Sequence, residues 1–122
     1  MIIEYDAKKL TYKVEVVFPY TLTDSKKELA EEIIKYWGRI PYVSVEGIYS
    51  IQWVNRWQGY NKKSIVYISV DFTKSASDDY LMREPLEKLG EWLFKGTPRR
   101  KDGTQKHKGL YVEIISVRTS EV

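Results

Sequence analysis

In residues 43–72, VSVEGIYSIQWVNRWQGYNKKSIVYISVDF, two runs of alternating apolar and polar residues flank a short polar stretch. Side chains alternate between the two faces of a β-strand, so each run predicts a strand with one buried face. Gly47 interrupts the first run and predicts a bend or bulge. The residues expected on the buried face of the first strand are Val43, Val45, Tyr49, Ile51 and Trp53.

Residues 58–63, QGYNKK, lie between the two runs and have the composition of a turn, with glycine and asparagine close together. The two strands are therefore expected to form an antiparallel hairpin. In the second strand the inward-facing residues are Val66, Ile68, Val70 and Phe72, and Tyr67, Ser69 and Asp71 face the other way.

An upstream run, residues 12–18, alternates in the same way and predicts a further strand that ends at Pro19. Residues 2–5, IIEY, are a candidate for an extra N-terminal strand paired with this run. The intervening DAKK lacks the Asn-Gly or Asp-Gly pair that is typical of a two-residue hairpin turn, so the extra strand stays an open alternative. The apolar side of the upstream run consists of Tyr12, Val14, Val16 and Phe18.

The first helix is predicted from Ser25 to Trp37. Ser25 and Glu28 have the spacing of a capping box, in which each side chain satisfies a backbone N–H at the start of a helix. Gly38 is a typical residue just beyond a helix end. The apolar residues that recur on one side of this stretch are Leu29, Ala30, Ile33, Ile34 and Trp37.

A second helix is predicted from Asp78 or Arg83 to Lys95, with Gly96 as its stop. Pro85 is expected in the first turn, where its missing N–H does no harm, or at a kink. The apolar side of this helix consists of Met82, Leu86, Leu89 and Leu93. A final strand is predicted where Leu110, Val112 and Ile114 alternate with Tyr111, Glu113 and Ile115.

The predicted order is strand, helix, strand, strand, helix, strand, in a single domain that spans residues 1–122. This order is typical of α+β proteins and in particular of the ferredoxin-like βαββαβ sandwich, in which an antiparallel sheet carries two helices on one face. A chain of this length can bury one hydrophobic core. One cooperative unit is therefore expected.

The composition narrows the class of protein. The chain has no cysteine, which excludes disulfides, thiolate metal sites and cysteine nucleophiles and favours a cytoplasmic protein. No apolar run is long enough to span a bilayer, so no membrane is expected as a partner. The abundance of Lys, Glu, Ile and Tyr is thermophile-like. A net charge of +3 describes a small basic protein and is compatible with an acidic partner.

Positive charge is concentrated in the basic loop, residues 96–109, GTPRRKDGTQKHKG. From Lys95 to Lys108, six Lys or Arg stand against one Asp, a local charge of +5, so the rest of the chain carries −2 of the total of +3. Clustered cations on a loop neutralise phosphates and release counterions. A solvated loop that keeps the protein soluble is the alternative.

Aromatic and basic residues are interleaved around the turn of the predicted hairpin, in the stretch WVNRWQGYNKK that begins at Trp53. Exposed aromatic rings stack on unpaired bases with about 1 to 3 kcal/mol per base, and cations beside them contact phosphates. Trp57 and Tyr60 are the candidates for stacking, whereas Trp53 is expected to fill the core. The loop and the hairpin can form one nucleic-acid-binding surface only if they lie on the same side of the fold.

No motif for catalysis or for a cofactor is found. GxxxxGK[ST] and GxGxxG are absent, and His107 is the only histidine and is expected to be exposed to solvent. Asp71, Asp78 and Asp79 are candidates for a magnesium site. The better explanation needs no metal: Asp71 is an outward-facing strand residue, and Asp78 and Asp79 are acidic residues of the kind favoured at a helix N-terminus. No cofactor is therefore expected.

The sequence therefore predicts a nucleic-acid-binding domain that prefers single strands and has little sequence specificity, with DNA and RNA both open. A protein-interaction or structural module of a virus or mobile element, as a homodimer, is the alternative, since aromatic and Arg-rich surfaces also form protein interfaces. A metal-dependent nuclease is the second alternative. The residues predicted to contact nucleic acid are Arg99, Arg100, Lys101, Lys106, Lys108, Arg56, Lys62, Lys63, Trp57 and Tyr60.

Overall fold

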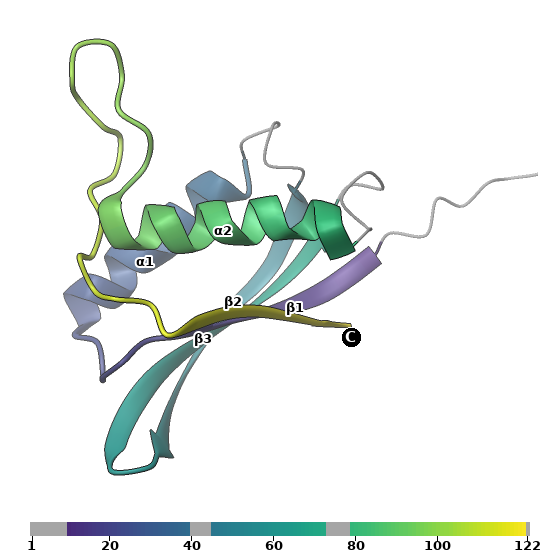
Figure 1. The fold of residues 1–122 in the computed structure, drawn as a ribbon, viewed down its shortest axis with the longest axis vertical. Helices are drawn as coiled ribbons and strands as arrows, with labels where there is room; N and C mark the ends of the chain where they lie inside the picture. The colour runs from purple at the N-terminus through teal and green to yellow at the C-terminus, as the bar shows by residue number, and fades with distance from the viewer. Residues whose placement is uncertain (1–9, 40–44, 73–78, 122) are drawn as a thin grey trace, which may run out of the picture.

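The computed structural model describes residues 10–39, 45–72 and 79–121, and Figure 1 shows their arrangement. The extra N-terminal strand considered at residues 2–5 lies outside the described residues. In chain order the elements are β1 (Leu10–Val17), α1 (Asp24–Trp37), β2 (Val45–Gln58), β3 (Asn61–Phe72), α2 (Asp79–Lys95) and β4 (Ser116–Glu121).

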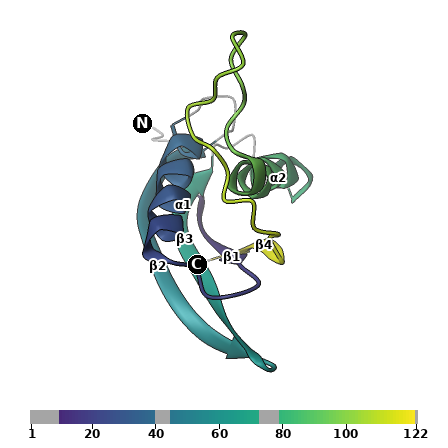
Figure 2. The same cartoon turned by 90° about the vertical axis from the view of Figure 1, so that its left-hand side faces the viewer.

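The four strands form one antiparallel sheet in the order β2-β3-β1-β4. The prediction of an α+β chain with a four-stranded antiparallel sheet and two helices is confirmed. In Figure 2 the sheet is curved, and both helices lie on its concave side. Within the described residues, neither helix combines the length and the apolar character that crossing a membrane requires.

The core forms between the two helices and one face of the sheet. In β1 and β3, Val14 is paired with Ile68 and Val16 with Val66, and all four side chains are fully buried. The inward set predicted for the second strand of the hairpin is confirmed, since all four residues belong to the core. Burial of apolar side chains is the main favourable term in folding, so this face holds the helices. The helix residues of the same cluster are Ala30, Ile33, Ile34, Trp37, Leu89, Trp92 and Leu93.

The helix α1 begins at a different cap from the predicted one. Thr23 has extended backbone angles, φ −69° and ψ 160°, and its Oγ1 accepts a hydrogen bond from the Lys26 N–H at 3.3 Å. The capping box predicted from Ser25 and Glu28 is therefore wrong, because Ser25 already lies inside the helix. A cap residue needs a non-helical backbone, which Thr23 has and Ser25 has not.

The two helices are joined by a buried hydrogen bond at an interior proline. Pro85 lies inside α2 and not in its first turn, and its carbonyl accepts from the Trp37 indole N–H at 2.9 Å. Trp37 is fully buried and packs edge-on against Phe72 of the sheet. Gly96 ends α2 with φ +96°, a left-handed conformation that favours glycine.

The pairing of β2 with β3 is interrupted twice, once at Gly47 and once at Tyr49. The first interruption confirms the predicted bulge. It also reverses the alternation, so Ile48 takes the inward position next to the core, and the second interruption leaves Tyr49 out of register and returns Ile51 to the inward side. Tyr49 is instead 61% exposed and donates a hydrogen bond to the buried carboxylate of Asp71. The prediction that Tyr49 lies on the buried face is therefore wrong.

The last strand lies later in the chain than predicted. β4 begins at Ser116, and residues 110–115 form no strand. The alternating burial was predicted correctly, since Leu110 and Val112 are buried in the core. The N–H groups of Leu110 and Tyr111 donate to carbonyls in the last turn of α2, at 2.9 and 2.8 Å. This stretch therefore satisfies the unpaired carbonyls of a helix end instead of pairing with a strand.

Replacing Trp37 by phenylalanine removes the bond between the helices and part of a fully buried side chain. We expect Trp37→Phe to lower the free energy of unfolding by about 1 to 3 kcal/mol. Trp57→Phe is the matched control, because Trp57 is 67% exposed, and its effect should stay below about 0.5 kcal/mol. Urea denaturation measures both values. Equal stability of the two variants would contradict the packing of α1 on α2.

Candidate functional site

β2 and β3 extend past the rest of the sheet as a hairpin arm, residues 55–64, at the lower end of Figure 1. β1 pairs with β3 only over residues 65–72, so no third strand accompanies the arm in the described sheet. Gly59 forms the turn with φ +68°. Trp57 is 67% exposed and Tyr60 is 100% exposed. The arm thus presents two large aromatic rings to a ligand.

The register of the arm places cations on both of its faces. Trp57 is paired with Lys62 on the side of the helices, and Arg56 is paired with Lys63 on the opposite side. Two cations directly opposite each other in neighbouring strands repel. The ten residues 55–64 include no Asp or Glu, so nothing within the arm neutralises its charge of +3. An anionic ligand would remove this repulsion.

Ser64 fixes the base of the arm. It is fully buried, and its hydroxyl donates to Asn55 Oδ1 and accepts from the Leu22 N–H, both at 2.9 Å. Its backbone N–H donates to the Tyr20 carbonyl at 3.3 Å, and its carbonyl accepts from the Phe18 N–H at 2.9 Å. Three of these bonds join the arm to the segment between β1 and α1, and the bond to Asn55 joins its two strands. The arm is therefore a supported extension of the sheet.

Three residues outside the predicted set continue the surface of the arm. Tyr20 is 46% exposed, and Lys26 Nζ lies 5.5 Å from the centroid of its ring. Lys27 Nζ lies 5.7 Å from the centroid of the Trp53 ring. The sequence contained a signal for the two lysines, because cations in the first turn of a helix are unfavourable next to the positive end of its dipole. Here aromatic rings supply a favourable partner.

Trp53 is structural, as predicted. Its ring is half-buried and lies 5.8 Å from that of Phe18, centroid to centroid. Its indole N–H donates to Glu31 Oε1 at 2.8 Å, which fastens β2 to α1. The helix layer therefore covers Trp53 and leaves Trp57, four residues later on the same strand, exposed.

The basic loop is a narrow hydrogen-bonded hairpin that projects from the end of α2 (Figure 2). Two β-bridges cross it, one of them between Arg99 and Gln105. Thr97 is buried at its base, where its N–H donates to the His107 carbonyl at 2.9 Å and its Oγ1 accepts from the His107 N–H at 3.0 Å. The loop therefore follows one defined backbone path.

Hydrogen bonds also close the tip of the basic loop. The Arg100 N–H donates to the Thr104 carbonyl at 2.6 Å, and the Arg99 guanidinium donates to the Gly103 carbonyl at 2.8 Å. Asp102 Oδ1 accepts from the hydroxyl of Thr104 at 2.6 Å and from its backbone N–H at 2.9 Å. These two bonds hold the pKa of Asp102 below its ordinary value. The one acidic residue of the loop thus serves the turn.

The base of the basic loop packs against α1. Lys106 Nζ lies 5.3 Å from the centroid of the Tyr36 ring, and the His107 ring packs edge-on against the same ring at 5.6 Å. His107 is half-buried, so the prediction of a solvent-exposed histidine is wrong, because Tyr36 covers it. The five predicted cations of the loop are all exposed, namely Arg99, Arg100, Lys101, Lys106 and Lys108.

The structure does not bring the two predicted groups of residues together. The hairpin arm and the basic loop point in opposite directions and form the two ends of the molecule along its longest axis (Figures 1 and 2). Both helices lie between them. The arm and the loop are therefore two separate surfaces, each with its own cations.

The structure describes only part of the acidic group considered for a magnesium site. Asp71 is buried in β3 and accepts the hydrogen bond of Tyr49, which raises the pKa of Tyr49. Asp78 lies outside the described residues, and Asp79 is the first residue of α2. Among the described residues, no three His, Cys, Asp or Glu are grouped as a metal ion would require.

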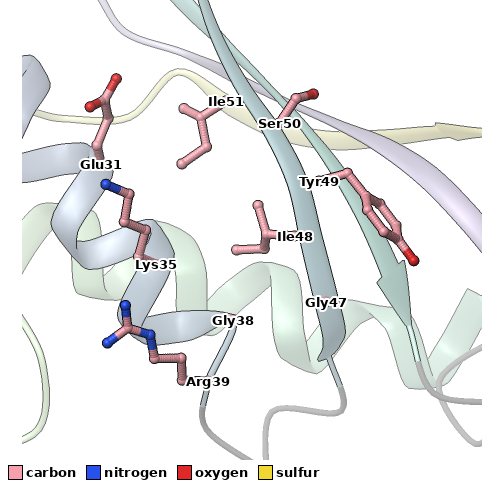
Figure 3. Close-up of a pocket in the computed structure, with 9 residues that line it drawn as sticks. All are labelled: Glu31, Lys35, Gly38, Arg39, Gly47, Ile48, Tyr49, Ser50 and Ile51. Atoms are coloured by element: carbon pink, nitrogen blue, oxygen red, sulfur yellow. The ribbon is translucent and has the colours of Figure 1, made fainter.

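A pocket of about 590 Å³ lies between α1 and the outer edge of β2 (Figure 3). Glu31, Lys35 and Arg39 line it on the helix side, and Ile48 and Ile51 point into it from β2. It is an open groove with an apolar floor and charges of both signs on its rim. This combination selects no single class of ligand, so the arm and the loop are the better candidates.

No protein-family model matches this chain, no curated protein matches it, and no solved structure matches it. Likeness to other proteins therefore assigns neither the fold nor the site. The geometry and the charge of the arm and the loop are the features that bear on what the protein binds.

We expect Ser64→Ala to loosen the hairpin arm. The Leu22 backbone N–H and the side-chain oxygen Oδ1 of Asn55 lose their hydrogen-bond partner, which lowers the free energy of unfolding by about 1 to 3 kcal/mol. Amide hydrogen exchange in residues 55–64 should become faster. Thr21→Ala is the control, because it removes an exposed bond to the arm and should have the smaller effect. Exchange that is equally slow in all three proteins would contradict this role of Ser64.

The lowered pKa of Asp102 makes the tip of the basic loop sensitive to acid. The ionised carboxylate of Asp102 stabilises the folded loop. This stabilisation is fully present above the pKa that Asp102 has in the unfolded chain, and it is lost as the pH falls through the lower pKa that Asp102 has in the folded protein. In NMR spectra the Thr104 amide should titrate with a midpoint below that of an ordinary aspartate. Thr104→Val, which lacks the hydroxyl, should raise the midpoint. A wild-type midpoint at or above the ordinary value would refute the assignment.

Proposed function

We propose that this chain binds single-stranded nucleic acid, with little sequence specificity, through the hairpin arm. One observation carries the proposal: Trp57 and Tyr60, exposed to 67% and 100%, share a supported ten-residue hairpin with three cations and no acidic residue. Aromatic faces beside cations suit a ligand with flat bases and charged phosphates. A duplex keeps its bases stacked inside and offers the two rings no base face.

Each group of the arm has a separate task in this proposal. Trp57 and Tyr60 stack on bases, and Lys62, paired with Trp57, contacts the adjacent phosphate. A phosphate between Arg56 and Lys63 removes the repulsion within that pair and is held by charge-assisted hydrogen bonds. These contacts involve ring faces and phosphates but no base edges, so sequence specificity is low and DNA and RNA both fit.

We also propose that the chain forms one domain of the ferredoxin-like type. The antiparallel order β2-β3-β1-β4 supports this, together with the helices that connect β1 to β2 and β3 to β4. In such a sandwich the helices occupy one face of the sheet, as they do in this chain (Figure 2). A hairpin between the second and third strands is then free to extend beyond the helices.

A protein-interaction module that forms a homodimer is the competing proposal, and one observation favours it. β2 is 14 residues long and has a hydrogen-bonded neighbour on one side only in the described sheet. Such an edge pairs readily with a strand of another chain. Ionic strength separates the two proposals, because phosphate contacts weaken steeply with salt whereas an interface built on strand pairing and aromatic rings weakens little.

Removing one stacking ring should weaken binding without unfolding the protein. We expect Trp57→Ala and Tyr60→Ala each to raise the Kd for a single-stranded oligonucleotide by roughly 5- to 150-fold, since one base stack is worth about 1 to 3 kcal/mol. Tyr111→Ala is the control, because Tyr111 is 63% exposed and lies outside the arm. Fluorescence anisotropy with labelled DNA and RNA gives the Kd values. Folded variants that all bind like the wild type would remove the arm from consideration.

A further inference from the structure

We infer that the basic loop is a second phosphate-binding element, so that one chain holds two separate segments of nucleic acid at once. The inference rests on the proposed function, which places the first segment on the hairpin arm. The second segment binds to residues 96–109, at the opposite end of the molecule (Figures 1 and 2). The protein would then bridge two strands, or two distant parts of one strand.

The basic loop holds its charges in a fixed arrangement before any ligand arrives. Its two sides are bridged at Gly96 with Lys108 and at Arg99 with Gln105. The buried Thr97 anchors the base, and the bonds around Asp102 close the tip. A flexible loop loses conformational entropy when it binds, and an ordered one loses less. This order is unnecessary for a loop that only keeps the protein soluble.

The cations of the basic loop are available to an external anion. Residues 96–109 contain five Lys or Arg and one Asp, a charge of +4. Asp102 accepts two hydrogen bonds from Thr104. The ion pairs between described residues all lie within helices, namely Lys35 with Glu32, Lys88 with Glu84 and Lys95 with Glu91.

The chemistry of the basic loop differs from that of the arm. Residues 96–109 include no Trp, Tyr or Phe, and their one aromatic ring, that of His107, is half-buried and packs against Tyr36 instead of standing free to stack on a base. Arg99 already donates to the Gly103 carbonyl, and Lys106 lies over the Tyr36 ring. All five cations are exposed, and Arg100, Lys101 and Lys108 are the three left besides Arg99 and Lys106. The loop therefore contacts phosphates alone, and either a single strand or a duplex can supply them.

One short strand cannot serve both elements. The arm and the loop point away from each other, with both helices between them (Figure 1). α1 and α2 each contain four Asp or Glu and three Lys or Arg, a charge of −1 per helix. A phosphate backbone is attracted to the two ends, at +3 and +4, and not to the path across the helices. Each end therefore takes its own segment.

Native mass spectrometry with a single-stranded oligonucleotide of about six nucleotides tests the inference. This length is at the short end of the roughly 4 to 16 nucleotides that single-strand-binding folds cover, so it fills one element. At low salt and saturation we expect one chain with two oligonucleotides. Replacing Arg100, Lys101 and Lys108 should leave one bound oligonucleotide per chain, and the Kd of that oligonucleotide should change less than about twofold. The loop variant carries Arg100→Gln, Lys101→Gln and Lys108→Gln.

A control variant removes the same charge from other exposed positions and should still bind two oligonucleotides. It carries Lys35→Gln, Arg39→Gln and Arg83→Gln. The inference would be overturned, and the arm proposal left intact, by two results together. The wild type would bind only one oligonucleotide at saturation, and the double variant of Trp57→Ala and Tyr60→Ala would bind none. Two chains with two oligonucleotides would also overturn the inference, because bridging would then belong to a homodimer. If no complex forms at all, the arm proposal falls as well.

Discussion

The unequal pairing of β3 is the constraint on which the rest of the structure depends. β3 pairs with β2 over residues 61–72 but with β1 only over residues 65–72. Where both neighbours are present, alternate side chains face the helices and build the core. Where β1 has ended, the same two strands leave the core as the hairpin arm. Ser64 lies at this boundary, and its four hydrogen bonds fix the point at which a core strand becomes a surface.

Periodicity predicted most of the secondary structure, and its failures have identifiable causes. The hairpin, both helices and the inward set of β3 follow a strict period and were predictable. Tyr49 was not, because its place depends on the register shifts before and after it and on a hydrogen bond to Asp71, which is distant in the sequence. Residues 110–115 alternate like a strand, yet their N–H groups bond to the end of α2. Alternating burial alone does not reveal the hydrogen-bond partner.

The members of the candidate site were predictable, but their arrangement was not. Trp53 and Trp57 share one face of β2, and only the reach of the helix layer separates them, since Glu31 of α1 bonds to Trp53. The reach of a helix over a sheet is a tertiary property. The opposite directions of the arm and the loop also depend on the tertiary structure, because the arm continues the sheet layer whereas the loop extends from the helix layer (Figure 2). A sequence pattern contains neither piece of information.

The most direct test of the arm as a binding surface is ultraviolet crosslinking of a single-stranded oligonucleotide, with the crosslinked residues mapped by mass spectrometry. If the arm binds the bases, crosslinks form at Trp57 and Tyr60 at low salt and are lost as the salt concentration rises. Crosslinks confined to other parts of the chain, or none in the folded protein at low salt, would contradict this role of the arm.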